Sequence, residues 1–278
     1  MKRLVLTILA VIFTILAFAR YKIIKSNDQQ GKPFLLIIPD VHGRSFWKKA
    51  VESYPDIPVI FLGDYLDPYN NEIENISNEE AFANFREILE YKRKRSSSVT
   101  LLLGNHDIHY IDNDYAFSRK DTLNEKEIHD IFMESLSLFK LVANVEISDR
   151  QILFSHAGVL VGWVRKHYPS LLETDILSLC DSINNNLKDE KLFVKYISDA
   201  LMDVTSVRGG DAEYGSLVWA DDTEHIHSKE HLPDVYQIFG HSQLENAPKI
   251  CEHHANLDCR RAFLLTDKAN IIECRVNK

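Results

Sequence analysis

Five short segments of the chain carry side chains that commonly bind metal ions, each with a glycine close by. The side chains are Asp40 and His42, Asp64, Asn105 and His106, His156, and His241. Carboxylates, an amide oxygen and imidazoles together suit Mn²⁺, Fe²⁺ or Zn²⁺ better than Ca²⁺, which prefers oxygen alone. The set predicts metal chemistry, with two ions that share one bridging carboxylate.

Each of these segments follows an apolar run, as expected for a β-strand that is buried on both faces. The runs are residues 34–38, 59–62, 99–103, 151–155 and 235–239. Apolar residues at helical spacing and a capping box, Ser77-x-x-Glu80, predict a helix between each two of the first three strands. Because such helices connect one strand to the next, the three strands are expected to pair in parallel. Because ligands bind at the carboxyl ends of parallel strands, we expect the five segments to meet at one edge.

Each segment taken alone has an ordinary structural explanation. An Asp or Asn beside a Gly commonly forms a turn, and a single His after an apolar strand is commonly a hydrogen-bonded core residue. Five together are different, because burying so many ionisable groups without a cation costs several kcal/mol. The combination favours a metal centre over five independent turns.

The second half of the chain predicts a second sheet. Residues 142–147 and 151–155 flank Ser148-Asp149-Arg150 and form one hairpin, and residues 261–265 and 271–276 form another. Capping boxes at Thr122 and Ser170 mark helix starts, further helices are expected over 170–183 and 188–202, and a short strand over 217–222. The predicted fold is α/β, with two packed sheets and helices outside.

Composition excludes some classes of function. The 278 residues carry a formal net charge of -9, which argues against long nucleic acid as a partner, since that would require a basic face. The cysteines, Cys180, Cys251, Cys259 and Cys274, include no Cys-x-x-Cys pair and lack zinc-ligand spacing. The sequence is compatible with a Cys251–Cys259 disulfide and equally with buried free thiols.

The N-terminus predicts a segment separate from the globular domain. Lys2 and Arg3 precede an uncharged run, 4–19, that ends in a candidate cleavage site, so residues 1–25 form a candidate signal peptide. If uncleaved, residues 4–24 are long enough to anchor the protein in a bilayer. We expect a linker over 26–32, a globular domain over 33–278, and export or membrane anchoring, with the side of the membrane open.

The ordered motifs resemble those of a known family, the calcineurin-like metallophosphoesterases. The matching segments are Asp40-x-His42-Gly43, Gly63-Asp64-x-x-Asp67, Gly104-Asn105-His106-Asp107, His156-Ala157-Gly158 and Gly240-His241. The phosphoprotein-phosphatase branch and its bacterial relatives look most similar, and Trp219-Ala220-Asp221 loosely resembles a segment of that branch. The resemblance implies a four-layer sandwich of two mixed sheets flanked by helices.

The resemblance also implies the roles of individual residues. Two divalent ions (Mn²⁺, Fe²⁺/Fe³⁺ or Zn²⁺) would bind to six residues: Asp40 and His42 for the first, Asp64 for both, and Asn105, His156 and His241 for the second. His106, oriented by Asp67, would protonate the leaving oxygen while a metal-activated hydroxide attacks phosphorus. Asp107 stands where many relatives have Glu and is expected to support the loop.

The sequence departs from the resemblance at the phosphate-binding arginines. Relatives of the phosphatase branch usually have Arg after the second motif, but here Pro68 follows Asp67, and a second Arg before Gly240 is also absent. Arg is the preferred bidentate partner of phosphate. Arg44 and Arg208 are the candidate substitutes, with an ordinary surface charge as the alternative for each.

The function predicted from this resemblance is hydrolysis of phosphomonoesters. Hydrolysis of a phosphodiester or of a nucleotide pyrophosphate is the alternative, because of the missing arginines. A membrane-tethered binding module without turnover is disfavoured, since no metal ligand of the motifs is missing. The partner is then a phosphorylated substrate of open identity, together with the membrane if the N-terminal segment is retained.

Overall fold

Two mixed β-sheets form the centre of the computed structural model, which describes residues 30–70, 74–112, 119–172 and 174–275. Four parallel strands make up most of the first sheet, and an antiparallel hairpin completes it beside β1. In sheet order the strands are β11 (Ile271–Glu273), β10 (Phe263–Thr266), β1 (Pro33–Ile38), β2 (Val59–Phe61), β3 (Val99–Leu102) and β4 (Phe139–Lys140).

The second sheet combines a parallel centre with an antiparallel strand at each edge. In sheet order its strands are β5 (Val142–Ile147), β6 (Arg150–Ser155), β7 (Val235–Phe239), β9 (His254–Asn256) and β8 (Lys249–Ile250). Because β1, β2, β3, β6 and β7 are the strands that precede the five polar segments, each sheet contributes to the site.

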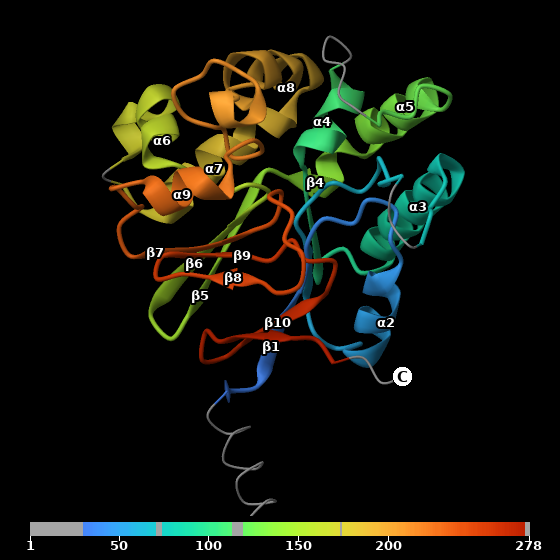
Figure 1. The fold of residues 1–278 in the computed structure, drawn as a ribbon, viewed down its shortest axis with the longest axis horizontal. Coiled ribbons are helices and arrows are strands. Elements are labelled where there is room, and N and C mark those ends of the chain that lie inside the picture. The colour runs from blue at the N-terminus through green and yellow to red at the C-terminus, as the bar shows by residue number, and fades with distance from the viewer. Residues whose placement is uncertain (1–29, 71–73, 113–118, 173, 276–278) are drawn as a thin grey trace, which may run out of the picture.

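Helices cover the outside of both sheets. Figure 1 shows α2, α3 and α5 beside the first sheet and α6 to α9 gathered above the strands of the second. Their bounds are α2 (Phe46–Ser53), α3 (Asn78–Lys94), α4 (Asn105–Ile111), α5 (Glu125–Ser135), α6 (Val161–His167), α7 (Ile176–Asn184), α8 (Glu190–Tyr196) and α9 (Asp222–His227). The expected α/β sandwich of two mixed sheets flanked by helices is confirmed.

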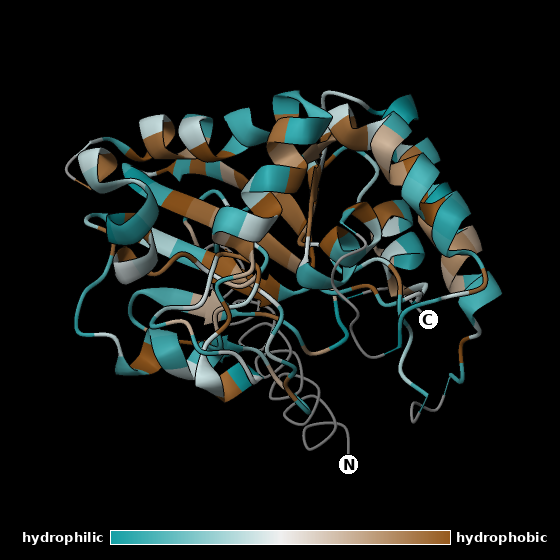
Figure 2. Ribbon diagram, turned by 90° about the horizontal axis from the view of Figure 1, so that it is seen from above, coloured by the Kyte–Doolittle hydropathy of each residue, from teal (hydrophilic) through white to brown (hydrophobic). Residues whose placement is uncertain are grey.

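Side chains of β1 alternate between two hydrophobic clusters. Leu35 and Ile37 pack between the sheets with residues such as Ile60, Phe154 and Ile238. Leu36 and Ile38 pack toward the helices with residues such as Trp47 and Phe85. Burial on both faces explains why the strand is apolar without interruption. Figure 2 shows hydrophobic strands in the interior, covered by helices whose outer faces are hydrophilic.

Several local expectations are confirmed. Ser77 and Glu80 form the predicted capping box at the start of α3. The hairpin of β5 and β6 turns at Ser148 and Asp149, which both have positive φ angles, 51° and 62°. Such a pair of left-handed residues matches the twist of two antiparallel strands.

Three local expectations are wrong. Residues 217–222 form no strand, because they turn and then enter α9, whose first turn is capped by the Asp221 carboxylate. Helix α5 begins at Glu125 with Asn124 rather than Thr122 as its N-cap residue. Helix α7 begins after Asp175, whose side chain accepts from Ser178 N–H, so Ser170 does not cap it.

The N-terminal predictions lie almost entirely outside the described residues. The leader 1–25 and most of the linker 26–32 therefore stay predictions, which amino-terminal sequencing of the mature protein tests. Among the described residues, no helix combines the length and the apolar character needed to cross a membrane. The four cysteines are free thiols, and Cys180, Cys259 and Cys274 are buried.

Phe85 of α3 offers a test of the packing between helices and sheet. Its ring is fully buried and lies 5.3 Å from the Tyr65 ring and 4.8 Å from the Phe132 ring, centroid to centroid. Replacing it by Ala leaves a cavity, so we expect Phe85→Ala to lower the free energy of unfolding by about 3–5 kcal/mol. Phe34→Ala is the matched control, because Phe34 is 41% exposed. Urea denaturation measures both, and equal losses for the two variants would contradict this packing.

Candidate metal centre and proton donor

Asp64, which follows β2, lies between two groups of metal-ligating side chains. Its Oδ2 is 3.4 Å from His42 Nε2 and 3.5 Å from His156 Nε2. Asp40 and His42 form one group with Asp64, and His156 and His241 form the other, with the ligand atoms of each group within 4.8 Å of one another. The carboxylate that was predicted to bridge two ions is thus shared by both groups.

The second group also contains the amide of Asn105. Asn105 Oδ1 lies 3.0 Å from His156 Nε2 and 2.9 Å from His241 Nδ1, and the two ring nitrogens are 3.2 Å apart. Atoms that bind one ion at about 2.1 Å and at right angles to each other are about 3 Å apart. The three atoms therefore have the mutual spacing of ligands around a single ion.

The protonation of two histidines tests whether a cation fits here. His42 Nδ1 and His156 Nδ1 each lie 2.8 Å from a main-chain carbonyl oxygen, which only accepts, so each Nδ1 carries a proton. Burial lowers the pKa of both rings, so both are neutral, and each Nε2 presents a lone pair to the Asp64 carboxylate. Acceptors that face one another repel unless a proton or a metal ion lies between them, and burial raises the pKa of Asp64 well above its ordinary value. The residues present fit divalent ions, including the carbonyl anchors typical of metal-binding histidines.

Asp40, which follows β1, joins the two sheets at this site. Its two carboxylate oxygens lie 3.0 and 3.1 Å from the main-chain N of His241, which follows β7 and donates to them. Burial raises the pKa of Asp40 to about 6. A Cβ atom at Gly240 would lie 2.0 Å from Asp40 Oδ1, so only Gly permits this close approach.

The backbone at the site is left-handed at four residues that carry side chains. The φ angles are 44° at His42, 52° at Asp64, 59° at Asp67 and 65° at His241. This conformation costs roughly 1–2 kcal/mol for a residue with a Cβ atom. The surrounding loops maintain it through main-chain bonds, among them those from Val41 and His42 N–H to Asp64 O.

The carboxylate of Asp107 fastens the loops after β2 and β3 to each other. It accepts from the N–H groups of Asp64 at 2.8 Å, Tyr65 at 3.0 Å and Gly104 at 2.7 Å. The side chain is fully buried, and burial raises its pKa well above the ordinary value. These contacts agree with a supporting role for Asp107.

His106 and Asp67 form a hydrogen-bonded pair next to the metal-ligating groups. His106 Nδ1 lies 2.6 Å from Asp67 Oδ2, and His106 Nε2 lies 3.1 Å from Arg119 Nη2. Arginine only donates, so Nε2 accepts there and the ring is neutral. Burial also favours the neutral ring, since it lowers the pKa of His106 to about 4.

The sequence did not indicate two further partners of Asp67. His109 Nε2 lies 2.8 Å from Asp67 Oδ2, and the Tyr110 hydroxyl donates to Asp67 Oδ1. Burial alone would raise the pKa of Asp67, but hydrogen bonds from His106 and His109 hold it below its usual range. A helix starting at Asn105 places positions 106, 109 and 110 on one face, so expecting α4 would have revealed both residues.

A cavity of about 360 Å³ opens onto this site, lined by Asp64, Tyr69, Asn105, His106, Arg119, Arg208, Trp219 and His241. Of the two arginines predicted to bind substrate, Arg208 lines it, held by Ser242 Oγ at 2.7 Å and Asp221 Oδ2 at 2.8 Å. Arg44 is not a lining residue; it is buried behind the site, with Nη1 at 3.3 Å from the main-chain oxygen of Asp40 and Cζ at 5.5 Å from the centre of the Tyr69 ring. Arg119, which no motif marks, lines the cavity instead.

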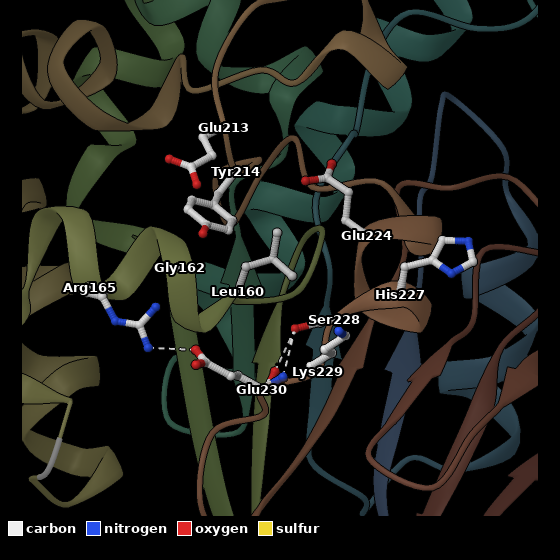
Figure 3. Close-up of a pocket in the computed structure, with 10 residues that line it drawn as sticks. All are labelled: Leu160, Gly162, Arg165, Glu213, Tyr214, Glu224, His227, Ser228, Lys229 and Glu230. Atoms are coloured by element: carbon white, nitrogen blue, oxygen red, sulfur yellow. Dashed lines mark hydrogen bonds and ion pairs between the residues drawn. The ribbon is translucent and has the colours of Figure 1, made fainter.

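A second cavity, of about 430 Å³, lies between α6 and the segment around α9. Figure 3 shows that Arg165 and Glu230, on the wall of this cavity, pair with each other at 2.6 Å. Glu224 is occupied too, because it accepts from the N–H groups of Gly215 and Asp221. None of the predicted site residues lines this cavity.

Comparisons with known proteins agree with this geometry. Residues 35–272 match the model of a family described as calcineurin-like phosphoesterase. A catalytic subunit of protein phosphatase 2A from Dictyostelium discoideum is 25% identical over 252 residues, covering 84% of this chain and 74% of the relative.

One solved structure has a similar fold, and a second solved structure matches with a lower score. A cold-active protein tyrosine phosphatase has a TM-score of 0.53 at 14% identity, covering 89% of this chain and 81% of its own. A protein serine/threonine phosphatase from Saccharomyces cerevisiae has a TM-score of 0.48 at 10% identity, covering 91% and 82%.

The shared position of Asp64 predicts how metal binding should respond to mutation. His42→Ala and His241→Ala each remove a ligand from one group, so each should weaken binding of one ion by at least about 10-fold. Asp64→Asn removes the shared carboxylate and should weaken both. Titration calorimetry with Mn²⁺ on metal-stripped protein measures the affinities, with His227→Ala, an exposed histidine, as control. If His42→Ala and His241→Ala both bound Mn²⁺ as the wild type does, the grouping would be wrong.

Proposed function

The chain belongs to the calcineurin-like phosphoesterase family, and from the geometry of its site we propose that it hydrolyses phosphomonoesters with two divalent ions and with His106 as the general acid. Family membership makes it a hydrolase of phosphoesters. One observation carries the finer proposal: Asp64, which both metal-ligating groups share, lines the same cavity as His106, which is paired with Asp67.

The metal-ligating groups contain both nitrogen and oxygen donors, which favours Mn²⁺, Fe²⁺/Fe³⁺ or Zn²⁺. When bound, such ions lower the pKa of water and take up negative charge from phosphate oxygens. Asp40 and His42 would hold one ion, Asn105, His156 and His241 the other, and Asp64 both. The neutral state of the buried histidines is the state that binds metal.

His106 would protonate the oxygen of the leaving alcohol. Its Nδ1 is fixed by Asp67, so Nε2 is the atom that would transfer the proton. Nε2 now accepts from Arg119, so the ring would first take up a proton from solvent on Nε2 and then give it to the leaving oxygen. The ionised Asp67 carboxylate stabilises the doubly protonated ring that would result, and His109 and Tyr110 hold that carboxylate in place.

The named relatives suggest phosphoproteins as one class of monoester substrate, since a catalytic protein of the phosphatase 2A type and a tyrosine phosphatase are among them. Diesters and nucleotide pyrophosphates remain the alternative because Pro68, and not Arg, follows Asp67. Rates with p-nitrophenyl phosphate, bis-p-nitrophenyl phosphate and a dinucleotide discriminate these possibilities.

The acid role of His106 predicts a dependence on the leaving group. Alkyl alcohols are poor leaving groups and need a proton, whereas p-nitrophenolate leaves readily without one. With Mn²⁺ present, His106→Ala should lower kcat for an alkyl phosphate such as phosphoserine by about 10²–10⁴-fold. The loss with p-nitrophenyl phosphate should be much smaller.

Steady-state kinetics on both substrates measures the difference, and His227→Ala serves as the histidine control. Equal losses for the two substrates would eliminate the acid role of His106. No turnover of any monoester by the wild-type protein with Mn²⁺, Fe²⁺ or Zn²⁺ would overturn the proposed function itself.

A further inference from the structure

We propose that Arg119 binds the phosphate group of the substrate and makes the cavity selective for a terminal, dianionic phosphate. The inference rests on the proposed phosphomonoesterase function and assigns a residue that no motif of the sequence marks. Arg119 follows α4 in the chain, and its side chain lines the same cavity as Asp64, Asn105 and His241.

The guanidinium of Arg119 lies beside the atom that would donate the proton. Arg119 Nη2 lies 3.1 Å from His106 Nε2, the atom that faces the leaving oxygen in the proposed reaction. A phosphate whose leaving oxygen contacts His106 has its remaining oxygens within about 3 Å of that oxygen, since they share one phosphorus atom. The guanidinium is therefore within hydrogen-bonding reach of the phosphate.

The positive charge of Arg119 faces only neutral hydrogen-bond acceptors among the described residues. Within the described residues, no ion pair joins its guanidinium to a carboxylate; its partners are the main-chain oxygen of Asp67 and His106 Nε2. Arg208, by comparison, pairs with Asp221 at 2.8 Å. A guanidinium with only neutral acceptors in a partly buried cavity gains most from an anion, because charge-assisted bonds are about twice as strong as neutral ones.

Neighbouring groups hold the Arg119 side chain in this position. Arg119 Cζ lies 3.7 Å from the centre of the Tyr69 ring, so the guanidinium stacks on an aromatic face. Its bond to the Asp67 main chain fixes the other end of the group. Tyr69 and Asp67 thus orient the guanidinium beside the His106 ring, and Tyr69 is a positioning residue.

The class of substrate follows from the charges around the cavity. Two guanidinium groups, those of Arg119 and Arg208, line it. A monoester carries two negative charges near neutral pH and a diester only one. The uncompensated guanidinium therefore favours the monoester, and its removal should reduce that preference.

Inorganic phosphate is the probe that tests this assignment. Binding to the Mn²⁺-loaded, full-length protein is measured by titration calorimetry for the wild type, Arg119→Ala, Arg119→Lys and the matched control Arg165→Ala, whose arginine pairs with Glu230 at the second cavity. We expect Arg119→Ala to weaken phosphate binding by about 10- to 100-fold. Lys should restore only part of the loss, since it lacks the planar fork, and Arg165→Ala should change nothing.

A second measurement separates phosphate binding from a structural effect. Manganese content and thermal midpoint should match the wild type in Arg119→Ala, and KM for p-nitrophenyl phosphate should rise more than KM for the bis ester. Tyr69→Phe should retain phosphate affinity and Tyr69→Ala should lose part of it.

Phosphate affinity within twofold of the wild type in Arg119→Ala, or a loss accompanied by loss of manganese, would overturn the proposal. Because phosphate binding needs no turnover, a protein that binds phosphate through Arg119 but hydrolyses no monoester would refute the proposed function and leave this binding residue in place.

Discussion

The buried carboxylate of Asp64 is the interaction on which the site depends. One oxygen faces His42 and His156, the other accepts from His106 N–H, and the main-chain N–H is held by Asp107. Removing such a carboxylate from water costs several kcal/mol unless cations compensate it. Within the described residues, the groups nearest to its free oxygen are neutral imidazoles, and burial raises the pKa of this carboxyl well above its ordinary value, so bound ions would compensate its charge. The donor groups on either side provide a place for them.

The two sheets come together through the same residues. Asp40 of the first sheet accepts from His241 after the second, and His156 of the second donates to Leu62 O after β2. Leu35 and Ile37 pack between the sheets just before the chain reaches Asp40. The residues that join the two sheets at this end are thus also residues of the site.

The sequence predicted the two sheets, and it singled out the six candidate metal ligands, because both leave local patterns. Strands buried on both faces are apolar runs, and the polar residues follow them directly. Other features have no such pattern. Arg119 lies beside His106 although no motif marks it, and residues 217–222 are apolar enough for a strand but turn because Asp221 caps α9. His109 and Tyr110 became recognisable only once α4 was known to begin at Asn105.

The left-handed backbone at His42, Asp64, Asp67 and His241 has an evolutionary consequence. Besides Gly, the residues that occupy this conformation at least cost are Asn, Asp and His. These same residue types supply the carboxylate, amide and imidazole groups that bind metals. Drift at these positions is therefore confined by backbone geometry to a small set of residues, most of which retain a metal-binding atom.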